Sequence, residues 1–223
     1  MEFNSISFLL FFAIVVVLYY NLNKRNRFIL LLISSFLFYS FWNWKYSFLL
    51  IISGITDYYV SKKIYESAKK KEKRIYLTIS IIVNLGLLIY FKYLFFITEN
   101  LNFFSESFGL GFNLDVLNIM LPFGISFYTF ETISYSVDVY RGVLKPEKSF
   151  IKYALFVAFF PKLVAGPIQR ANEFLPQLQN KIKFSTETLF EGLKRILFGL
   201  FLKVVFADNI AGFVDDAYSY DFA

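Results

Sequence analysis

The stretch "FPKLVAGPIQR" at residues 160–170 decides how the second half of this chain folds. Two prolines, a glycine and a lysine interrupt an apolar run that begins near Tyr153. Proline removes a helical hydrogen bond and kinks or ends a helix, and a lysine is costly in hydrocarbon. The stretch therefore predicts a break in the chain at membrane depth instead of a plain crossing helix.

The composition is that of an integral membrane protein. The chain has 223 residues, of which 57% are hydrophobic and 22% aromatic, whereas soluble domains are about 45–50% apolar. Its formal charge of +6 comes from basic residues that cluster beside apolar runs, so it indicates orientation in a membrane and no nucleic-acid partner. The chain has no cysteine and no histidine, which excludes disulfides, thiolate nucleophiles and imidazole bases within it.

Several runs are long enough, or nearly so, to cross the roughly 20-residue depth of a bilayer. We expect crossings at Ile6–Tyr20, Phe28–Trp44, Tyr46–Tyr59, Ile75–Ile97, residues 121–140 and about Lys194–Val214. With the broken segment at 153–168, this predicts an all-α, multi-span membrane protein with a re-entrant segment. Residues 1–223 would form a single transmembrane domain without a separate soluble domain.

Lysine and arginine set the expected orientation. The basic segments 23–27 and 61–74 are separated by two crossings, so both lie on one side, which the positive-inside rule makes cytoplasmic. The N-terminus and the loop Thr98–Asn118, which has acids and no basic residue, are then extracytoplasmic.

The segment "LPFGISFYTFETISYSVDVY" (121–140) is too polar for a helix that faces lipid. At helical spacing, one face carries Glu131, Ser134 and Asp138. A second face carries Ser126, Thr129, Thr132 and Ser136. Intramembrane carboxylates usually face a bundle interior or a watery cavity. The simpler alternative is that Asp138 pairs with Arg141 and that the hydroxyls bond back to their own helix.

The opening stretch lies between two segments, 141–152 and 169–184, that both read as cytoplasmic. Residues 153–168 must then enter and leave on one side, with the reversal at Pro161 and at Ala165-Gly166-Pro167. Non-helical backbone at this depth needs protein or a water-filled cavity around it. We therefore expect a cavity lined by Lys162, Gly166, Pro167 and Arg170. A kinked crossing helix with a snorkelling Lys162 is the alternative.

Three blocks resemble the membrane-bound O-acyltransferase (MBOAT) superfamily, in its bacterial alginate O-acetyltransferase branch. They are "LPFGISFYTFETISYSVDVYRG", "FVAFFPKLVAGPIQRANEFLPQL" and "GLKRILFGLFLKVVFADNIA". The resemblance covers nearly the whole chain. It implies a ring of tilted helices around a thin core, in the inner membrane of a bacterium. It also implies transfer of an acyl group, by default acetyl from acetyl-CoA with no bound cofactor, to an extracytoplasmic polysaccharide, through a periplasmic or extracellular acetyltransferase partner.

The chain departs from this family in one important respect. The family's presumed catalytic residue is a histidine, and this chain has none. We expect it to be the N-terminal half of an acyltransferase and inactive alone, with no metal site. Two further classes stay open, a transporter or channel and a non-catalytic scaffold. Lys162 would either attract phosphates of the donor as a point charge or pair with Glu131 or Asp138.

Overall fold

The computed structural model describes residues 2–115, 119–164, 166–179 and 184–219. Within those ranges every regular element is a helix, so the predicted all-α class is confirmed. The chain forms two compact units. The larger runs from Leu22 to Asn180, and the smaller combines Met1–Asn21 with Lys181–Ala223. The single transmembrane domain remains a prediction.

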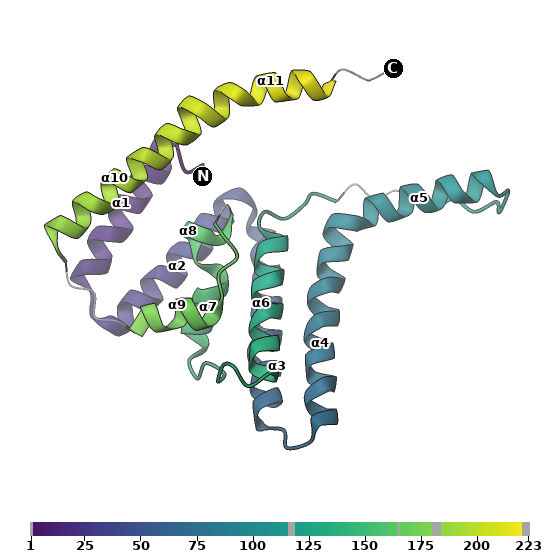
Figure 1. The fold of residues 1–223 in the computed structure, drawn as a ribbon, viewed down its shortest axis with the longest axis horizontal. Helices are drawn as coiled ribbons and strands as arrows, with labels where there is room; N and C mark the ends of the chain where they lie inside the picture. The colour runs from purple at the N-terminus through teal and green to yellow at the C-terminus, as the bar shows by residue number, and fades with distance from the viewer. Residues whose placement is uncertain (1, 116–118, 165, 180–183, 220–223) are drawn as a thin grey trace. The chain divides into compact units, whose positions relative to one another are not determined.

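The larger unit is organised around three helices that pack side by side (Figure 1). These are α3 (Ser47–Glu66), α4 (Lys70–Leu88) and α6 (Ile125–Tyr140). The chain enters this group through α2 (Lys24–Asn43) and the short turn η1 (Trp44–Tyr46). Tyr39 and Tyr46 donate hydrogen bonds to the carbonyls of Phe123 and Met120, both at 2.9 Å. These bonds fix the segment that leads into α6.

The expected break in the second half of the chain is present as a helical hairpin. It comprises α7 (Phe150–Ala158), α8 (Phe160–Leu163) and α9 (Ala171–Gln179). Phe159 leaves the helical conformation at φ −57° and ψ 107°, just ahead of Pro161. α7 packs on α2 and α3, α8 packs on α2, and α9 returns along α7. The chain therefore reverses where the prolines and the glycine predict.

Helices that continue beyond their predicted ends account for most of the differences from expectation. After α4 the helix runs on through the π-helical turn η2 (Ile89–Tyr93) into α5 (Leu94–Ser107). Residues 98–107, expected as a loop, are thus helical, because apolar residues remain frequent there and no proline or glycine interrupts them. Conversely, α6 begins at Ile125 and not at residue 121, since Gly124 adopts φ +73° before it.

The smaller unit contains α1 (Ile6–Asn21), α10 (Thr186–Phe201), the π-helical turn η3 (Leu202–Ala207) and α11 (Asp208–Ser219). An edge-on ring contact joins Tyr20 to Phe184, with ring centroids 5.2 Å apart. None of the described side chains of α10 and α11 is buried. The helix extends at both ends past the expected span of Lys194–Val214.

Three continuous helical stretches in the described residues are long and apolar enough to cross a membrane. They are Lys24–Glu66, Lys70–Ser107 and Thr186–Ser219. Ile6–Asn21 is apolar but shorter, and the first stretch turns at η1. These helices confirm a membrane protein, whereas the number of six crossings remains a prediction.

In this protein many large apolar side chains are exposed, and many polar side chains are buried. Large apolar side chains such as Phe96, Leu197 and Phe213 are exposed, while hydroxyls, an amide and several charges are buried. Isolated apolar residues on a surface are ordinary, but whole helices covered with them require an apolar surround. The buried polar side chains are therefore the candidates for a functional site.

Candidate functional site

Residues from the two polar faces predicted for α6 lie in two different buried clusters, Glu131 in one and Thr132 and Ser136 in the other. We call them the hairpin cluster and the Asp57 cluster. The hairpin cluster comprises Glu131, Phe156, Lys162, Gln169 and Phe174. The Asp57 cluster comprises Ser53, Asp57, Ser80, Asn84, Thr132 and Ser136.

The centre of the hairpin cluster is an ion pair between α6 and α8. The Lys162 Nζ donates to both carboxylate oxygens of Glu131, at 2.9 and 2.8 Å. The two side chains are only 8% and 6% exposed. The backbone N–H of Gln169, on the returning arm of the hairpin, also donates to Glu131 Oε1 at 3.0 Å. One carboxylate thus holds both arms of the hairpin against α6.

Two aromatic rings complete the surroundings of Lys162. Its ammonium lies 4.4 Å from the ring centroid of Phe156 on α7 and 4.8 Å from that of Phe174 on α9. A cation over the face of an aromatic ring gains about 0.5–2 kcal/mol, more when desolvated. The positive charge of Lys162 is therefore compensated inside the protein, by Glu131 and the two rings. This is the pairing alternative, with Glu131 and not Asp138 as the partner.

Close backbone approaches bring the hairpin this near to α6. A Cβ added to Gly124 would lie 2.3 Å from the carbonyl oxygen of Leu163 in α8. A Cβ on Gly166 would lie 2.5 Å from the Cα of Lys162, and the Gly166 N–H donates to the Lys162 carbonyl at 2.9 Å. Both glycines leave room that a side chain would fill. The predicted turn residue Ala165 lies outside the described residues.

The Asp57 cluster joins α3, α4 and α6 without any basic residue. Asp57 Oδ1 accepts hydrogen bonds from the hydroxyls of Ser80 and Ser136, the latter at 2.9 Å. Its Oδ2 accepts from the amide of Asn84 at 2.6 Å. A carboxylate buried in this way is stabilised by donors on two neighbouring helices.

Asn84 connects this carboxylate to the other hydroxyls of the cluster. Its Oδ1 accepts from Ser53 at 2.6 Å and from Thr132 at 3.1 Å, while its amide also donates to the Ser80 carbonyl at 2.9 Å. The orientation of the amide follows from these partners. Of the second polar face of α6, Thr132 and Ser136 point inward to this cluster, whereas Ser126 accepts from the Lys92 ammonium at 3.4 Å.

Sequence analysis missed Asp57. A carboxylate within the apolar run Tyr46–Tyr59 is itself a signal, since intramembrane acids normally face a protein interior. It was overlooked because it lies two residues from the predicted end of that run, beside a basic loop. The serine and asparagine in Ile75–Ile97, spaced four apart at Ser80 and Asn84, are the matching donors.

The remaining predicted site residues make local contacts only. Ser134 is half-buried and donates to the carbonyl of Glu131 in its own helix at 2.8 Å. Asp138 is buried, and no ion pair with Arg141 occurs in the described part of the chain. The Asp138 carbonyl accepts from the N–H of Val143 at 2.9 Å where α6 ends. Pro167 and Arg170 are exposed, and the Arg170 carbonyl starts α9.

The chemistry open to these clusters is limited. The chain has no histidine or cysteine, and the described residues contain no group of three or more His, Cys, Asp or Glu that fits a metal. Glu131, considered as a general base, already pairs with Lys162. The clusters are thus suited to holding segments in place.

Comparisons with known proteins cover nearly the whole chain. It is 37% identical over 223 residues to a protein named probable alginate O-acetylase AlgI of Pseudomonas aeruginosa, across 98% of this chain and 42% of that protein. It is 36% identical over 211 residues to a peptidoglycan O-acetyltransferase of Helicobacter pylori, across 83% of this chain and 39% of that protein. A teichoic acid D-alanyltransferase of Bacillus subtilis is 28% identical over 91 residues, 40% of this chain and 23% of that protein.

The chain therefore spans less than half the length of these curated relatives. No protein-family model matches the chain. No solved structure matches it either.

Proposed function

Because this chain belongs to the membrane-bound O-acyltransferase family that includes the bacterial alginate O-acetylases, we propose that it forms part of a polysaccharide O-acyltransferase. The observation that carries the proposal is the 37% identity over 98% of the chain to a probable alginate O-acetylase. The enzyme would move an acetyl group from acetyl-CoA on the cytoplasmic side to hydroxyls of an extracytoplasmic polysaccharide.

The hairpin supports this proposal physically. Carrying an acyl group from one side of a bilayer to the other requires a thin middle with broken helices, which persist only where protein or water covers them. α7, α8 and α9 form such an element, and the pair of Lys162 with Glu131 holds it against α6. In this proposal Lys162 holds the hairpin in place and does not bind the donor. A periplasmic or extracellular acetyltransferase partner would complete delivery to the polysaccharide.

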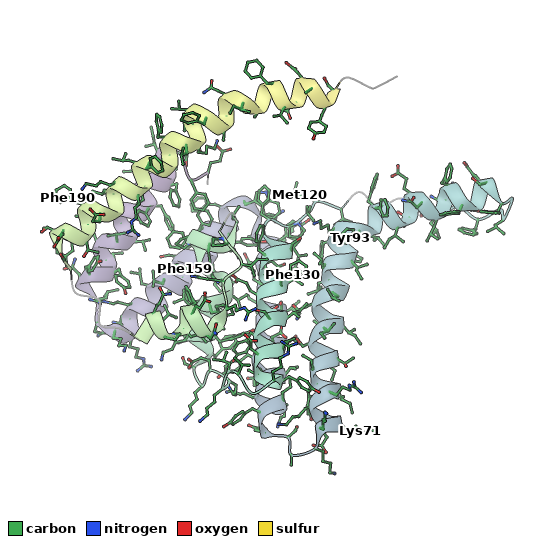
Figure 2. The ribbon with its side chains drawn as sticks, in the orientation of Figure 1. Lys71, Tyr93, Met120, Phe130, Phe159 and Phe190 are labelled. Atoms are coloured by element: carbon green, nitrogen blue, oxygen red, sulfur yellow. The ribbon has the colours of Figure 1, made fainter. Side chains whose placement is uncertain are left out.

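The distribution of basic segments supports the proposed orientation in the inner membrane. The Lys152 ammonium lies 5.6 Å from the ring centroid of Phe28, near the basic start of α2. Figure 2 shows Lys71, in the basic first turn of α4, at the opposite end of this unit from Met120. We propose that the basic segments 23–27, 61–74, 141–152 and 169–184 all face the cytoplasm and that the N-terminus is extracytoplasmic.

Cysteine labelling tests this orientation, because the chain is free of cysteine. Ala68→Cys in the α3–α4 turn and Asn113→Cys beyond α5 both replace exposed residues. In intact cells we expect an impermeant maleimide to label Asn113→Cys and to leave Ala68→Cys unlabelled until the membrane is opened. Labelling of Ala68→Cys from outside would refute the orientation.

The proposed activity itself is tested with labelled acetyl-CoA and a polysaccharide acceptor. We propose that these 223 residues alone transfer no acetyl group, because they contain no imidazole to activate a hydroxyl near neutral pH. The same chain joined to the remaining length of an alginate O-acetylase serves as the positive control. Turnover by the 223 residues above an empty-membrane background would contradict the proposal and would direct attention to Asp138 and Asp57 as bases.

A further inference from the structure

A basic pocket opens where the hairpin begins. Its volume is about 450 Å³, and it lies between the segment that precedes α7 and the middle of α9. Its lining residues are Leu144, Lys145, Pro146, Glu147, Lys148, Ser149, Lys152, Leu175 and Pro176. Both arms of the hairpin therefore contribute to one concave surface.

The charges in this pocket are strongly unbalanced. Three lysines line it against one acid, and none of the ion pairs found in the described residues involves Lys145, Lys148 or Lys152. The Glu147 carboxylate is engaged, because it accepts from the Ser149 N–H at 2.9 Å. The lining therefore has a formal net charge of +2, and its lysines form no ion pair with a carboxylate among the described residues.

Two further features add positive potential and hold the pocket in shape. Ser149 is the N-cap of α7, and no side chain caps the helix there, so the first N–H groups of α7 open at the pocket. The Tyr58 hydroxyl donates to the Lys148 carbonyl at 2.6 Å and accepts from the Lys62 ammonium at 2.7 Å. A fourth cation thus stands beside the loop that carries Lys148.

We propose that this pocket binds the phosphate headgroup of an anionic phospholipid. The apolar residues around the pocket favour a lipid as the source of this phosphate. Val143 and Phe150, which directly flank its lining residues, are 62% and 39% exposed, and acyl chains would cover them while the headgroup meets the lysines. Basic pockets between helices on the cytoplasmic side are a known setting for anionic headgroups. The choice of leaflet rests on the proposed orientation, whereas the binding itself does not.

The bound lipid would hold the start of the hairpin, where α7 begins, in place. Its phosphate would sit between the start of α7 and the middle of α9, away from the tip that Lys162 and Glu131 hold. The hairpin would then be held at both ends, by an ion pair at its tip and by a phosphate at its base.

The test measures lipid binding to the full chain purified in a neutral detergent. Phosphatidylglycerol is titrated in and retained lipid is counted by native mass spectrometry, with phosphatidylcholine as the uncharged comparison. A lysine about 4 Å from the phosphate in a water-exposed pocket contributes about fivefold in affinity, so the triple variant Lys145→Gln/Lys148→Gln/Lys152→Gln is expected to lose on the order of 100-fold. The corresponding triple change to arginine keeps the charges and is expected to keep binding.

A matched control removes the same charge elsewhere at the same end of the protein. Lys70→Gln/Lys71→Gln/Lys73→Gln lies in the first turn of α4, outside the pocket lining, and is expected to change phosphatidylglycerol affinity less than threefold. An equal loss in both triple variants, or equal retention of the two lipids, would overturn the proposal.

Adenosine 3′,5′-bisphosphate is the soluble competitor, and displacement of the lipid by it at micromolar concentration would assign the pocket to a soluble phosphate instead. None of these results depends on acyl transfer, so a failed activity assay leaves the binding result intact.

Discussion

The hairpin cluster and the Asp57 cluster each bury a carboxylate, and they satisfy it in opposite ways. Glu131 faces one lysine and one backbone N–H, whereas Asp57 receives only uncharged side-chain donors. The first cluster concentrates its energy in a single Coulombic contact between segments that are 31 residues apart. The second distributes it over three helices. The two designs should respond differently to the loss of one group.

The largest effect is expected from Lys162→Met, which removes the cation and leaves Glu131 buried. Breaking one side of a buried pair costs about 3–5 kcal/mol, because the remaining charge is uncompensated. We expect the variant to be depleted from the membrane fraction and to unfold at lower temperature in detergent. Abundance is measured by in-gel fluorescence of a tagged chain.

The double variant Glu131→Gln/Lys162→Met distinguishes the ion pair from packing alone. It removes both charges and keeps an oxygen that can accept from the Gln169 N–H, so partial recovery is expected. Lys203→Met is the control, because Lys203 pairs with Asp208 at 2.7 Å on an exposed surface, where such pairs are worth about 0–1 kcal/mol. If the single variant at Lys162 were as abundant as this control, the pair would not hold the hairpin.

Asp57→Ala is the corresponding change in the other cluster. It leaves the Asn84 amide without its carboxylate, while the hydroxyls of Ser80 and Ser136 can rotate to other acceptors. An unsatisfied buried donor costs about 1–3 kcal/mol, so we expect a loss near the upper end of that range, below that of Lys162→Met. Thr56→Ala, one residue away and outside the cluster, should change thermal stability little. A greater loss than that of Lys162→Met would show that the Asp57 cluster is the more concentrated of the two.

Two glycines with nearly the same φ sharpen the comparison further. Gly124 and Gly142 have φ of +73° and +75°, but only Gly124 approaches another segment, at Leu163. Alanine at either position costs about 1–2 kcal/mol for the left-handed backbone. At Gly124 we expect a further 1–3 kcal/mol from overpacking against the hairpin. Equal thermal stability of Gly124→Ala and Gly142→Ala would mean that the hairpin moves away without cost.

The sequence predicts the parts of this fold that depend on local chemistry. Pro161 and Gly166 predicted a reversal, and the chain reverses there, because proline and glycine act on their own backbone. The spacing of polar residues in α6 predicted that they share faces of one helix, because helical periodicity is local as well. The inference that Lys162 meets an acid of α6 was also available from charge alone.

Two features depend on contacts between segments that are far apart in the sequence. They are the acid that pairs with Lys162 and the set of donors that surrounds Asp57. Glu131 and Asp138 lie on one face of α6, about 10 Å apart along a helix that rises 1.5 Å per residue. Only the depth to which the hairpin reaches selects between them. The donors to Asp57 come from separate helices, so no single segment shows that they meet. Helix ends such as that of α5 were also misplaced, since apolar composition alone does not set where a helix stops.

The smallest effects are expected from two serines two residues apart on α6. Ser136 donates to the Asp57 carboxylate at 2.9 Å, whereas Ser134 donates to the Glu131 carbonyl of its own helix at 2.8 Å. A hydrogen bond to a charged group is worth about 1.5–3 kcal/mol, but the remaining donors to Asp57 should limit the loss in Ser136→Ala to the lower end of that range. Ser134→Ala removes a bond to a carbonyl that the helix already satisfies, so its thermal stability in detergent should match that of the unaltered chain.

Both variants delete one oxygen from the same helix, and the difference between them isolates the charged acceptor. If the two were equally stable, the Asp57 carboxylate would gain nothing from Ser136. A Ser136→Ala loss as large as that of Asp57→Ala would mean that the cluster depends on one hydrogen bond and does not distribute its energy over three helices.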